Sequence, residues 1–121
     1  MKIKNNKFQE KIINDMKSYI HNNIYGKRIN AKDVCLKSGY SNHYMHRLFR
    51  QTTGQSLLSY INDVRIEKIT YLVINTDLTL TEIASKLGFA SLNDLTKFFK
   101  KRYGFPPSHF RKKVPTVKSF D

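Results

Sequence analysis

Two stretches of the chain carry side chains that can bind the bases and phosphates of DNA. On one side of the helix predicted over residues 42–53 lie His43, His46, Arg47 and Arg50. Fifty positions later, the same pattern places Asn93, Thr96, Lys97 and Lys100 together. Arginine and lysine donate to guanine O6 and N7, and asparagine pairs with adenine through two hydrogen bonds. Both stretches are therefore candidate surfaces for contacting double-stranded DNA.

Some of the same residues could also bind a metal or act in catalysis. His43 and His46 are three positions apart on one helix face, and Cys35 could supply a third metal ligand. No further spaced ligands complete a zinc site, and no orienting group or oxyanion-type glycine turn accompanies a Cys-His pair. We therefore expect no metal, no cofactor and no enzymatic activity.

The overall composition points to a polyanionic partner. The 121 residues allow one compact domain or two very small ones, which disfavours a large cofactor enzyme. Lys and Arg number 22 against 9 Asp and Glu, giving a formal net charge of +13. Nucleic acid is the leading candidate for such a charge, and an anionic membrane surface is the second.

The C-terminal end is the most basic part of the chain. Between positions 95 and 120 there is no acidic residue, and the basic residues are Lys97, Lys100, Lys101, Arg102, Arg111, Lys112, Lys113 and Lys118. We expect phosphate contacts from those on or beside the helix that follows Ser91, with a solubilising tail as the alternative, and we leave Lys118 open. The aromatic residues nearby could stack on single-stranded bases, but their helical spacing favours packing in a core: Phe98, Phe99, Tyr103, Phe105 and Phe110.

Nothing in the sequence indicates a membrane or secreted protein. The longest unbroken apolar run covers only residues 71–74, far short of the roughly 18 that a transmembrane helix needs. The basic N-terminus lacks the apolar stretch and cleavage site of a signal peptide. The single cysteine, Cys35, fits a reducing compartment. We expect a cytoplasmic location and no membrane partner.

Apolar periodicity and capping residues predict an all-α fold of seven helices. The helices are expected over residues 7–23, 31–38, 42–53, 56–75, 79–87, 91–103 and 106–111, with a loose tail over 114–121. Asn30, Ser41 and Ser91 are predicted N-caps, and Thr79 with Glu82 has the spacing of a capping box. The first helix carries an apolar stripe of Phe8, Ile12, Ile13, Met16, Tyr19 and Ile20.

The longest predicted helix, over 56–75, is apolar around much of its circumference. One narrow polar side holds Ser59, Asp63, Glu67 and Thr70, and the remaining surface is interrupted by Asn62, Arg65 and Lys68. A helix of this kind is usually packed from more than one direction. We therefore expect a connector at about 56–75 that joins a subdomain of about 7–55 to one of about 76–111, with 112–121 as the tail.

An internal repeat is the strongest signal in the sequence. Residues 33–40 match residues 82–89 at an offset of 49, and the offset becomes 50 after one inserted residue. Each copy is a short helix, a turn at glycine and a longer helix, which is a helix-turn-helix. The alignment assigns Met45, Leu48 and Phe49, with their counterparts Leu95, Phe98 and Phe99, to the core. The opposite faces and their edges supply the candidate DNA-contact residues: Asn42, His43, His46, Arg47, Arg50, Leu92, Asn93, Thr96, Lys97, Lys100 and Lys101.

Several short motifs resemble the AraC/XylS family of bacterial transcription regulators. The motifs are Ser38-Gly39-Tyr40-Ser41 with Arg47-Leu48-Phe49-Arg50, then Ile83-Ala84, Gly88-Phe89, Phe99-Lys100 and Tyr103-Gly104-Phe105-Pro106-Pro107. The chain is similar in length to the family's stand-alone members, which activate antibiotic-resistance and oxidative-stress genes. The resemblance implies a monomer that binds an asymmetric DNA site and contacts RNA polymerase. Where those activators have Trp-His-Leu-Gln-Arg and paired glutamines, this chain has residues 43–47, His-Tyr-Met-His-Arg, and Leu92-Asn93.

Three functional hypotheses follow. The leading one is a sequence-specific transcription activator that binds about 20 bp, because each helix-turn-helix covers about one turn of DNA. The alternative is a nonspecific nucleic-acid-binding or packaging protein, which would bind unrelated duplexes equally. A membrane-active cationic protein is disfavoured because the chain lacks a Trp-rich interfacial face. No effector domain fits in 121 residues, so control by cellular abundance is the simpler expectation.

Overall fold

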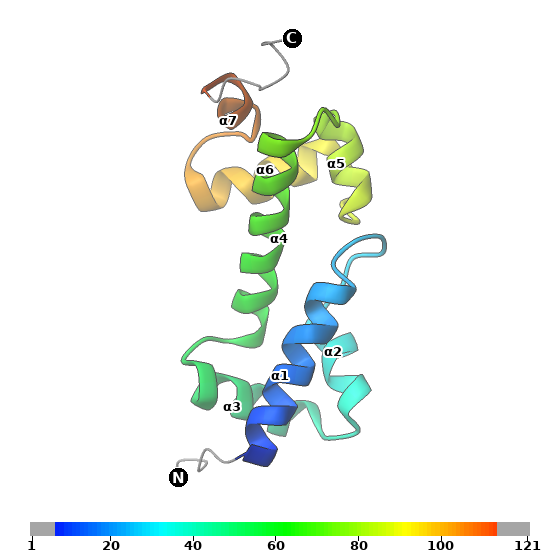
Figure 1. Cartoon of the computed structure of the whole chain (residues 1–121), viewed down its shortest axis with the longest axis vertical. Coiled ribbons are helices and arrows are strands. Elements are labelled where there is room, and N and C mark those ends of the chain that lie inside the picture. The colour runs from blue at the N-terminus through cyan, green and yellow to red at the C-terminus, as the bar shows by residue number, and fades with distance from the viewer. Residues whose placement is uncertain (1–6, 114–121) are drawn as a thin grey trace. The chain divides into compact units, whose positions relative to one another are not determined.

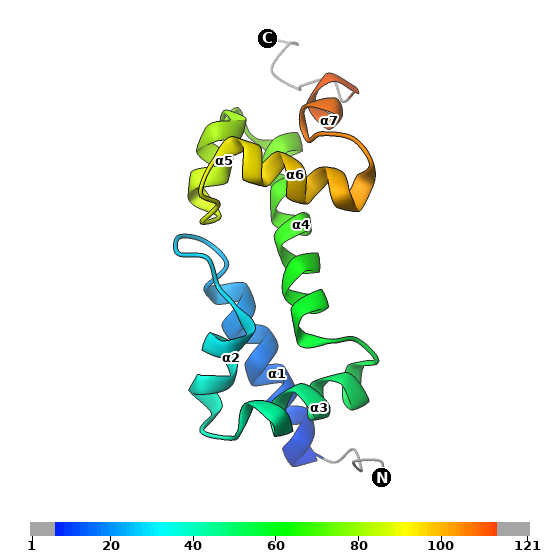
Figure 2. The same cartoon turned by 180° about the vertical axis from the view of Figure 1, so that it is seen from behind.

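The computed structural model describes residues 7–113. The regular secondary structure in this range consists of α-helices joined by turns and loops. Over this range the seven helices are α1 (Lys7–Asn22), α2 (Ala31–Ser38), α3 (Asn42–Thr53), α4 (Leu57–Asn75), α5 (Leu80–Lys86), α6 (Leu92–Tyr103) and α7 (Ser108–Lys113) (Figures 1 and 2). The predicted all-α fold is confirmed. The predicted tail over 114–121, including Lys118, lies outside the described residues.

Capping side chains define where the helices begin. The Asn30 side chain accepts a hydrogen bond from the Asp33 amide at 2.9 Å, and Ser41 Oγ accepts one from the Tyr44 amide at 3.1 Å. Thr79 and Glu82 form both hydrogen bonds of the predicted capping box. These side chains satisfy amides that have no partner within their own helix. The last helix begins later than predicted, because Pro106 and Pro107 lie before it and accept hydrogen bonds from its first turn.

The chain forms two compact units, and their boundaries differ from the predicted subdomains. Among the described residues, unit 1 comprises 7–24 and 29–64, and unit 2 comprises 25–28 and 65–113. Sequence reasoning treated α4 as a separate connector, whereas its first part belongs to unit 1 and its second part to unit 2. It also assigned residues 25–28 to the first subdomain, whereas these residues pack with unit 2.

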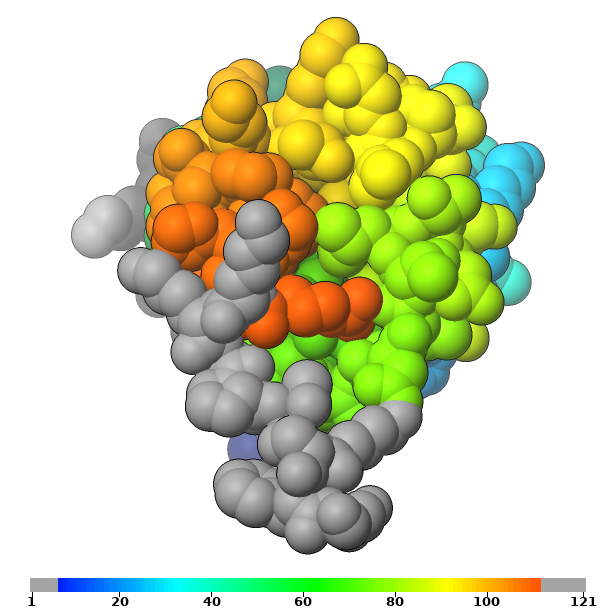
Figure 3. Space-filling model, turned by 90° about the horizontal axis from the view of Figure 1, so that it is seen from above, coloured from blue at the N-terminus to red at the C-terminus, as the bar shows by residue number. Residues whose placement is uncertain are grey.

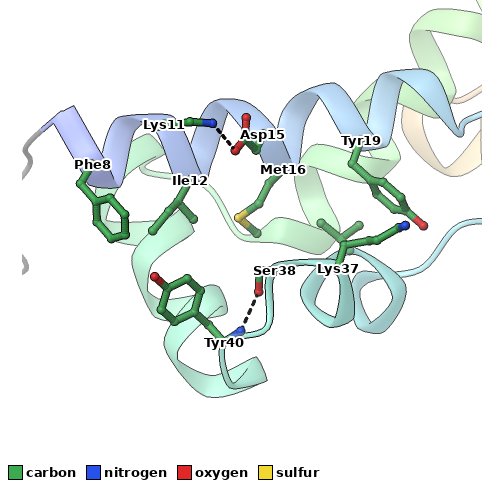
Figure 4. A pocket seen from close by; sticks show the side chains of 10 residues that line it. Phe8, Lys11, Ile12, Asp15, Met16, Tyr19, Lys37, Ser38 and Tyr40 are labelled. Atoms are coloured by element: carbon green, nitrogen blue, oxygen red, sulfur yellow. Dashed lines mark hydrogen bonds and ion pairs between the residues drawn. The ribbon is translucent and has the colours of Figure 1, made fainter.

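In unit 1, α1 packs against α2 and α3. The core side chains come from all three helices and from the start of α4: Ile12, Ile13, Met16, Ile20, Val34, Cys35, Met45, Leu48, Phe49, Leu57 and Ile61. Phe8 departs from the predicted apolar stripe, because its side chain is 61% exposed in the first turn of α1. With Tyr40 it lines a surface groove of about 290 Å³ whose apolar lining includes Ile12 and Met16 (Figure 4).

In unit 2, α5 packs against α6. The core contains Ile66, Ile69, Leu72, Val73, Ile83, Ala84, Leu87, Phe89, Leu95 and Phe99. The prediction of a buried ring fails for Phe98, which is half-buried and packs against Phe89 with ring centroids 5.3 Å apart. Leu95 and Phe99 are four residues apart and share the inward side, whereas Phe98 is rotated from Phe99 by about 100° around the helix.

The polar interruptions predicted along α4 do not all face water. Arg65 is only 2% exposed, and burial, followed by the nearby charge of Arg28, lowers its pKa to about 10. At the other extreme, Tyr71 on the same helix is 57% exposed. The apolar pattern of α4 therefore identified a helix packed on several sides, but it did not distinguish these two residues.

Aromatic side chains join α6 to α7. The Phe99 and Phe110 rings meet edge to face at 5.8 Å, and Tyr103 stacks on Phe105 at 6.0 Å. Phe105 also meets Phe110, with centroids 5.4 Å apart. These rings pack against one another, but the predicted core position is wrong for Tyr103, which is 39% exposed.

One basic residue of the C-terminal end is used inside unit 2. The guanidinium of Arg111 donates to backbone oxygens near the end of α4: to Leu78 at 2.6 Å, to Val73 at 3.1 Å and to Thr76 at 3.2 Å. The last carbonyls of a helix lack partners within that helix. Arg111 therefore ties α7 to the end of α4, and Figure 3 shows α7 beside the segment where α4 gives way to α5.

Candidate nucleic-acid interface

In unit 1, the outward surface of α3 carries the polar residues that the repeat singled out. Met45, Leu48 and Phe49 are fully buried, as predicted. The opposite side chains are all exposed and are named here the unit 1 reading face: Asn42, His43, His46, Arg47 and Arg50. The burial of one side of α3 thus leaves two arginines and two histidines facing solvent.

In unit 2, α6 presents an equivalent surface. Leu95 and Phe99 are fully buried, which turns the other side of the helix outward. The residues of this side are named the unit 2 reading face: Leu92, Asn93, Thr96, Lys97, Lys100 and Lys101. All are exposed except Thr96, which is half-buried. The structure therefore brings the candidate residues of each helix together on one accessible side.

The turn before α3 fixes where the unit 1 reading face begins. Ser38 Oγ donates to the Cys35 carbonyl at 2.7 Å and accepts from the Tyr40 amide at 3.0 Å. Gly39 adopts a φ of +80°, the left-handed conformation that favours glycine. The Tyr40 ring then contacts Tyr44 of α3, with centroids 5.4 Å apart. These contacts hold the first turn of α3, where Asn42 and His43 lie, in a defined position.

The basic groups of both reading faces are available to an external anion. Within residues 7–113, Arg47, Arg50, Lys97 and Lys100 have no ion-pair or hydrogen-bond partner for their side chains. By contrast, Lys11 pairs with Asp15 at 3.0 Å on the exposed side of α1. Unpaired, solvent-exposed cations grouped on one helix face suit contacts with phosphates and base edges.

The residues considered for metal binding differ in how exposed their side chains are. Cys35 is fully buried, and desolvation raises the pKa of its thiol, whereas His43 and His46 are exposed. Over the range that the structure describes, no group of three or more His, Cys, Asp or Glu side chains is arranged to hold a metal ion.

In the same range, no helix is both long enough and apolar enough to cross a lipid bilayer.

These features define a class of protein. Each unit contains a short helix, a glycine turn and a second helix whose outward side is polar and basic, which is the arrangement of a helix-turn-helix DNA-binding domain. Comparison with known families agrees, because a family described as "Helix-turn-helix domain" matches residues 30–113.

Relatives identify the family, and a solved structure shares the fold. The Msm operon regulatory protein of Streptococcus mutans is 34% identical over 84% of this chain and 36% of its own length. The regulatory protein SoxS of Escherichia coli is 31% identical over 87% of this chain and 97% of its own length. The C-terminal domain of AraT, a response regulator from Geobacillus stearothermophilus, superposes with a TM-score of 0.81 at 24% identity, covering 88% of each chain.

The chain belongs to the AraC-type family of helix-turn-helix transcription regulators. The members of this family that the chain matches are DNA-binding transcription regulators. The chain spans about a third of the length of two curated relatives that it matches, 36% of the Msm operon regulatory protein and 33% of the F1 operon positive regulatory protein of Yersinia pestis.

Proposed function

We propose that this chain binds double-stranded DNA sequence-specifically, as a monomer, with the two reading faces in neighbouring segments of the major groove. The observation that carries this proposal is that equivalent helices of the two units both turn polar and basic side chains outward, and the basic ones have no ion-pair partner within residues 7–113. Arg47 is suited to guanine and Asn93 to adenine, and Lys97 and Lys100 are suited to guanine or phosphate. Two reading helices together cover about 20 bp.

The family resemblance supports a more specific regulatory role. We propose that the chain activates antibiotic-resistance or stress-response genes in the cytoplasm and contacts RNA polymerase while bound to DNA. The basis is the likeness to SoxS, since the matched region covers 97% of that regulatory protein.

Selection of bound sites from random duplex DNA tests sequence specificity. The selected duplex and a scrambled duplex of the same composition are then titrated at one salt concentration. We expect a gap of about 4–10 kcal/mol between specific and nonspecific binding. Equal affinity for the two duplexes would overturn the proposal of sequence-specific binding and support the packaging alternative. Sedimentation of the complex at a ratio other than one chain per site would overturn the proposal that the chain binds as a monomer.

Transcription in a purified system tests the activator role. With bacterial RNA polymerase and a promoter that carries the selected site, adding the protein should increase the transcript. The matched control is the same promoter with the site scrambled. A decrease, or no change while the site is occupied, would contradict activation and leave DNA binding intact.

A further inference from the structure

The loop of residues 25–28, which is distant in sequence from α5 and α6, packs against the helix-turn-helix of unit 2. Residues 25–28 connect α1 to α2, yet they belong to unit 2. The Gly26 amide donates to the Lys86 carbonyl at the end of α5 at 2.6 Å. A Cβ atom on Gly88 would lie 2.5 Å from both the Arg28 nitrogen and the Gly26 oxygen. The loop backbone therefore fits against the turn between α5 and α6 because position 88 has no side chain.

This packing gathers basic side chains beside the turn. Lys27 and Arg28 are exposed, and the Arg28 guanidinium lies over the Phe89 ring at 5.4 Å. Lys86, also exposed, places its ammonium group over the Tyr25 ring at 5.3 Å. Two residues after Phe89 comes Ser91, the N-cap of α6. The cations are thus held next to the point where the unit 2 reading face begins.

The charges in this cluster are not neutralised by any carboxylate among residues 7–113. Across the described residues, the side chains of Lys27, Arg28 and Lys86 have no carboxylate partner. The Arg28 and Lys86 side chains contact aromatic rings, which leave the outer side of each cation free to meet an anion. The positive charge of Arg28 also acts inside unit 2, where it follows burial as a cause of the lowered pKa of Arg65. An arrangement of like charges fixed by backbone packing favours a bound anion.

We propose that Lys27, Arg28 and Lys86 form a site that contacts the phosphates of the DNA backbone beside the unit 2 reading face. The inference rests on the proposed DNA-binding function and adds a contact surface outside both reading helices. Phosphate contacts set the orientation of a protein on the duplex without selecting its sequence. The site therefore contributes to affinity and salt dependence, and sequence preference stays with the reading faces.

The test compares salt dependence between matched double variants. Lys27→Gln/Arg28→Gln removes two charges from the loop, and Lys7→Gln/Lys11→Gln removes two exposed charges from α1 as the control. Each protein is titrated with the selected duplex and with the scrambled duplex at several salt concentrations. One lost phosphate contact reduces the slope of log K against log salt by about 0.9, so the loop variant should lose about 1–2 and the control should match the wild type.

The ratio of affinities for the selected and scrambled duplexes should remain that of the wild type in the loop variant. Arg28→Lys keeps the charge and should preserve the slope. Lys27→Gln alone leaves the Arg28–Phe89 contact in place and should still reduce the slope by about 1. This single variant replaces the double variant if the double variant melts at a lower temperature than the wild type.

An unchanged slope, or equal losses in the loop and control variants, would overturn the phosphate site. Failure of the proposed function gives a different result, since the wild type would then bind the selected and scrambled duplexes equally. A loop variant that loses sequence preference while keeping its slope would also contradict the inference.

Discussion

At the scale of single residues, the two reading faces should separate base recognition from phosphate contact. Arg47→Ala should cost about 1–3 kcal/mol at one base pair and relax the preference there, because a paired arginine–guanine contact is worth that much. Lys100→Ala should weaken all duplexes by similar factors and reduce the salt slope by about 1. Titration against single-base variants of the site, at several salt concentrations, measures both effects. If Arg47→Ala leaves base preference intact, the assigned side of α3 is wrong.

Cys35 gives a residue-level prediction with a defined pH dependence. Burial raises the pKa of its thiol, so the unfolded chain loses this proton at a lower pH than the folded chain. The resulting contribution to stability is fully present below the unfolded pKa and is lost as pH rises through the folded pKa. Iodoacetamide should label Cys35 slowly in the native protein and rapidly in urea. Fast labelling under native conditions would show that the thiol is accessible.

At the scale of helices, buried rings should hold the reading helices in place. Phe49→Ala and Phe99→Ala should each lower the free energy of unfolding by about 3–5 kcal/mol, because both rings are fully buried. Leu92→Ala on α6 is the control, and it should change stability by less than about 0.5 kcal/mol because this side chain is at the surface. Urea denaturation measures all three. Small shifts for the phenylalanine variants, together with lost DNA binding, would show that the rings contact DNA instead.

The tie between α7 and α4 predicts a structural role for one basic residue. Arg111→Met keeps much of the side-chain length but leaves the carbonyls of Val73 and Leu78 without their donor, at a cost of about 1–3 kcal/mol. Arg111→Lys should restore only part of this stability, because an ammonium group lacks the planar set of donors. Thermal melting gives the comparison, with exposed Lys101→Met as the control. A normal melt with a reduced salt slope would instead assign Arg111 to phosphate binding.

At the scale of the whole molecule, the proposal requires both units to bind one DNA site. α4 is a continuous helix that contributes to both units, so we expect the two DNA elements to have a preferred spacing of about 10 bp. Inserting about 5 bp between them turns the second major-groove segment to the far side of the duplex. Affinity should then fall toward that of one unit, whereas an insertion of about 10 bp tests distance without rotation. Undiminished binding to the 5-bp insertion would show that only one unit recognises sequence.

The sequence alone determined the helices and the exposed sides of α3 and α6. Both are local properties, because apolar spacing and caps such as Ser41 and Thr79 act within one or two turns of a helix. The repeat strengthened the assignment by placing Phe49 and Phe99 at equivalent inward positions. The predicted burial was wrong for Phe8 and Phe98. Periodicity identifies the apolar side of a helix, but it does not show how far a neighbouring element covers that side.

Only the tertiary structure decided what Arg111 and the loop over 25–28 do. Arg111 bonds to carbonyls 33 to 39 positions away, and its basic character in the sequence suggested an external partner. Gly88 marks a turn in the sequence, but its contact with the backbone of Arg28 exists only once the loop has packed against unit 2. Such contacts join segments without a shared periodicity, so no pattern along the chain encodes them, and they arise when packing brings the segments together.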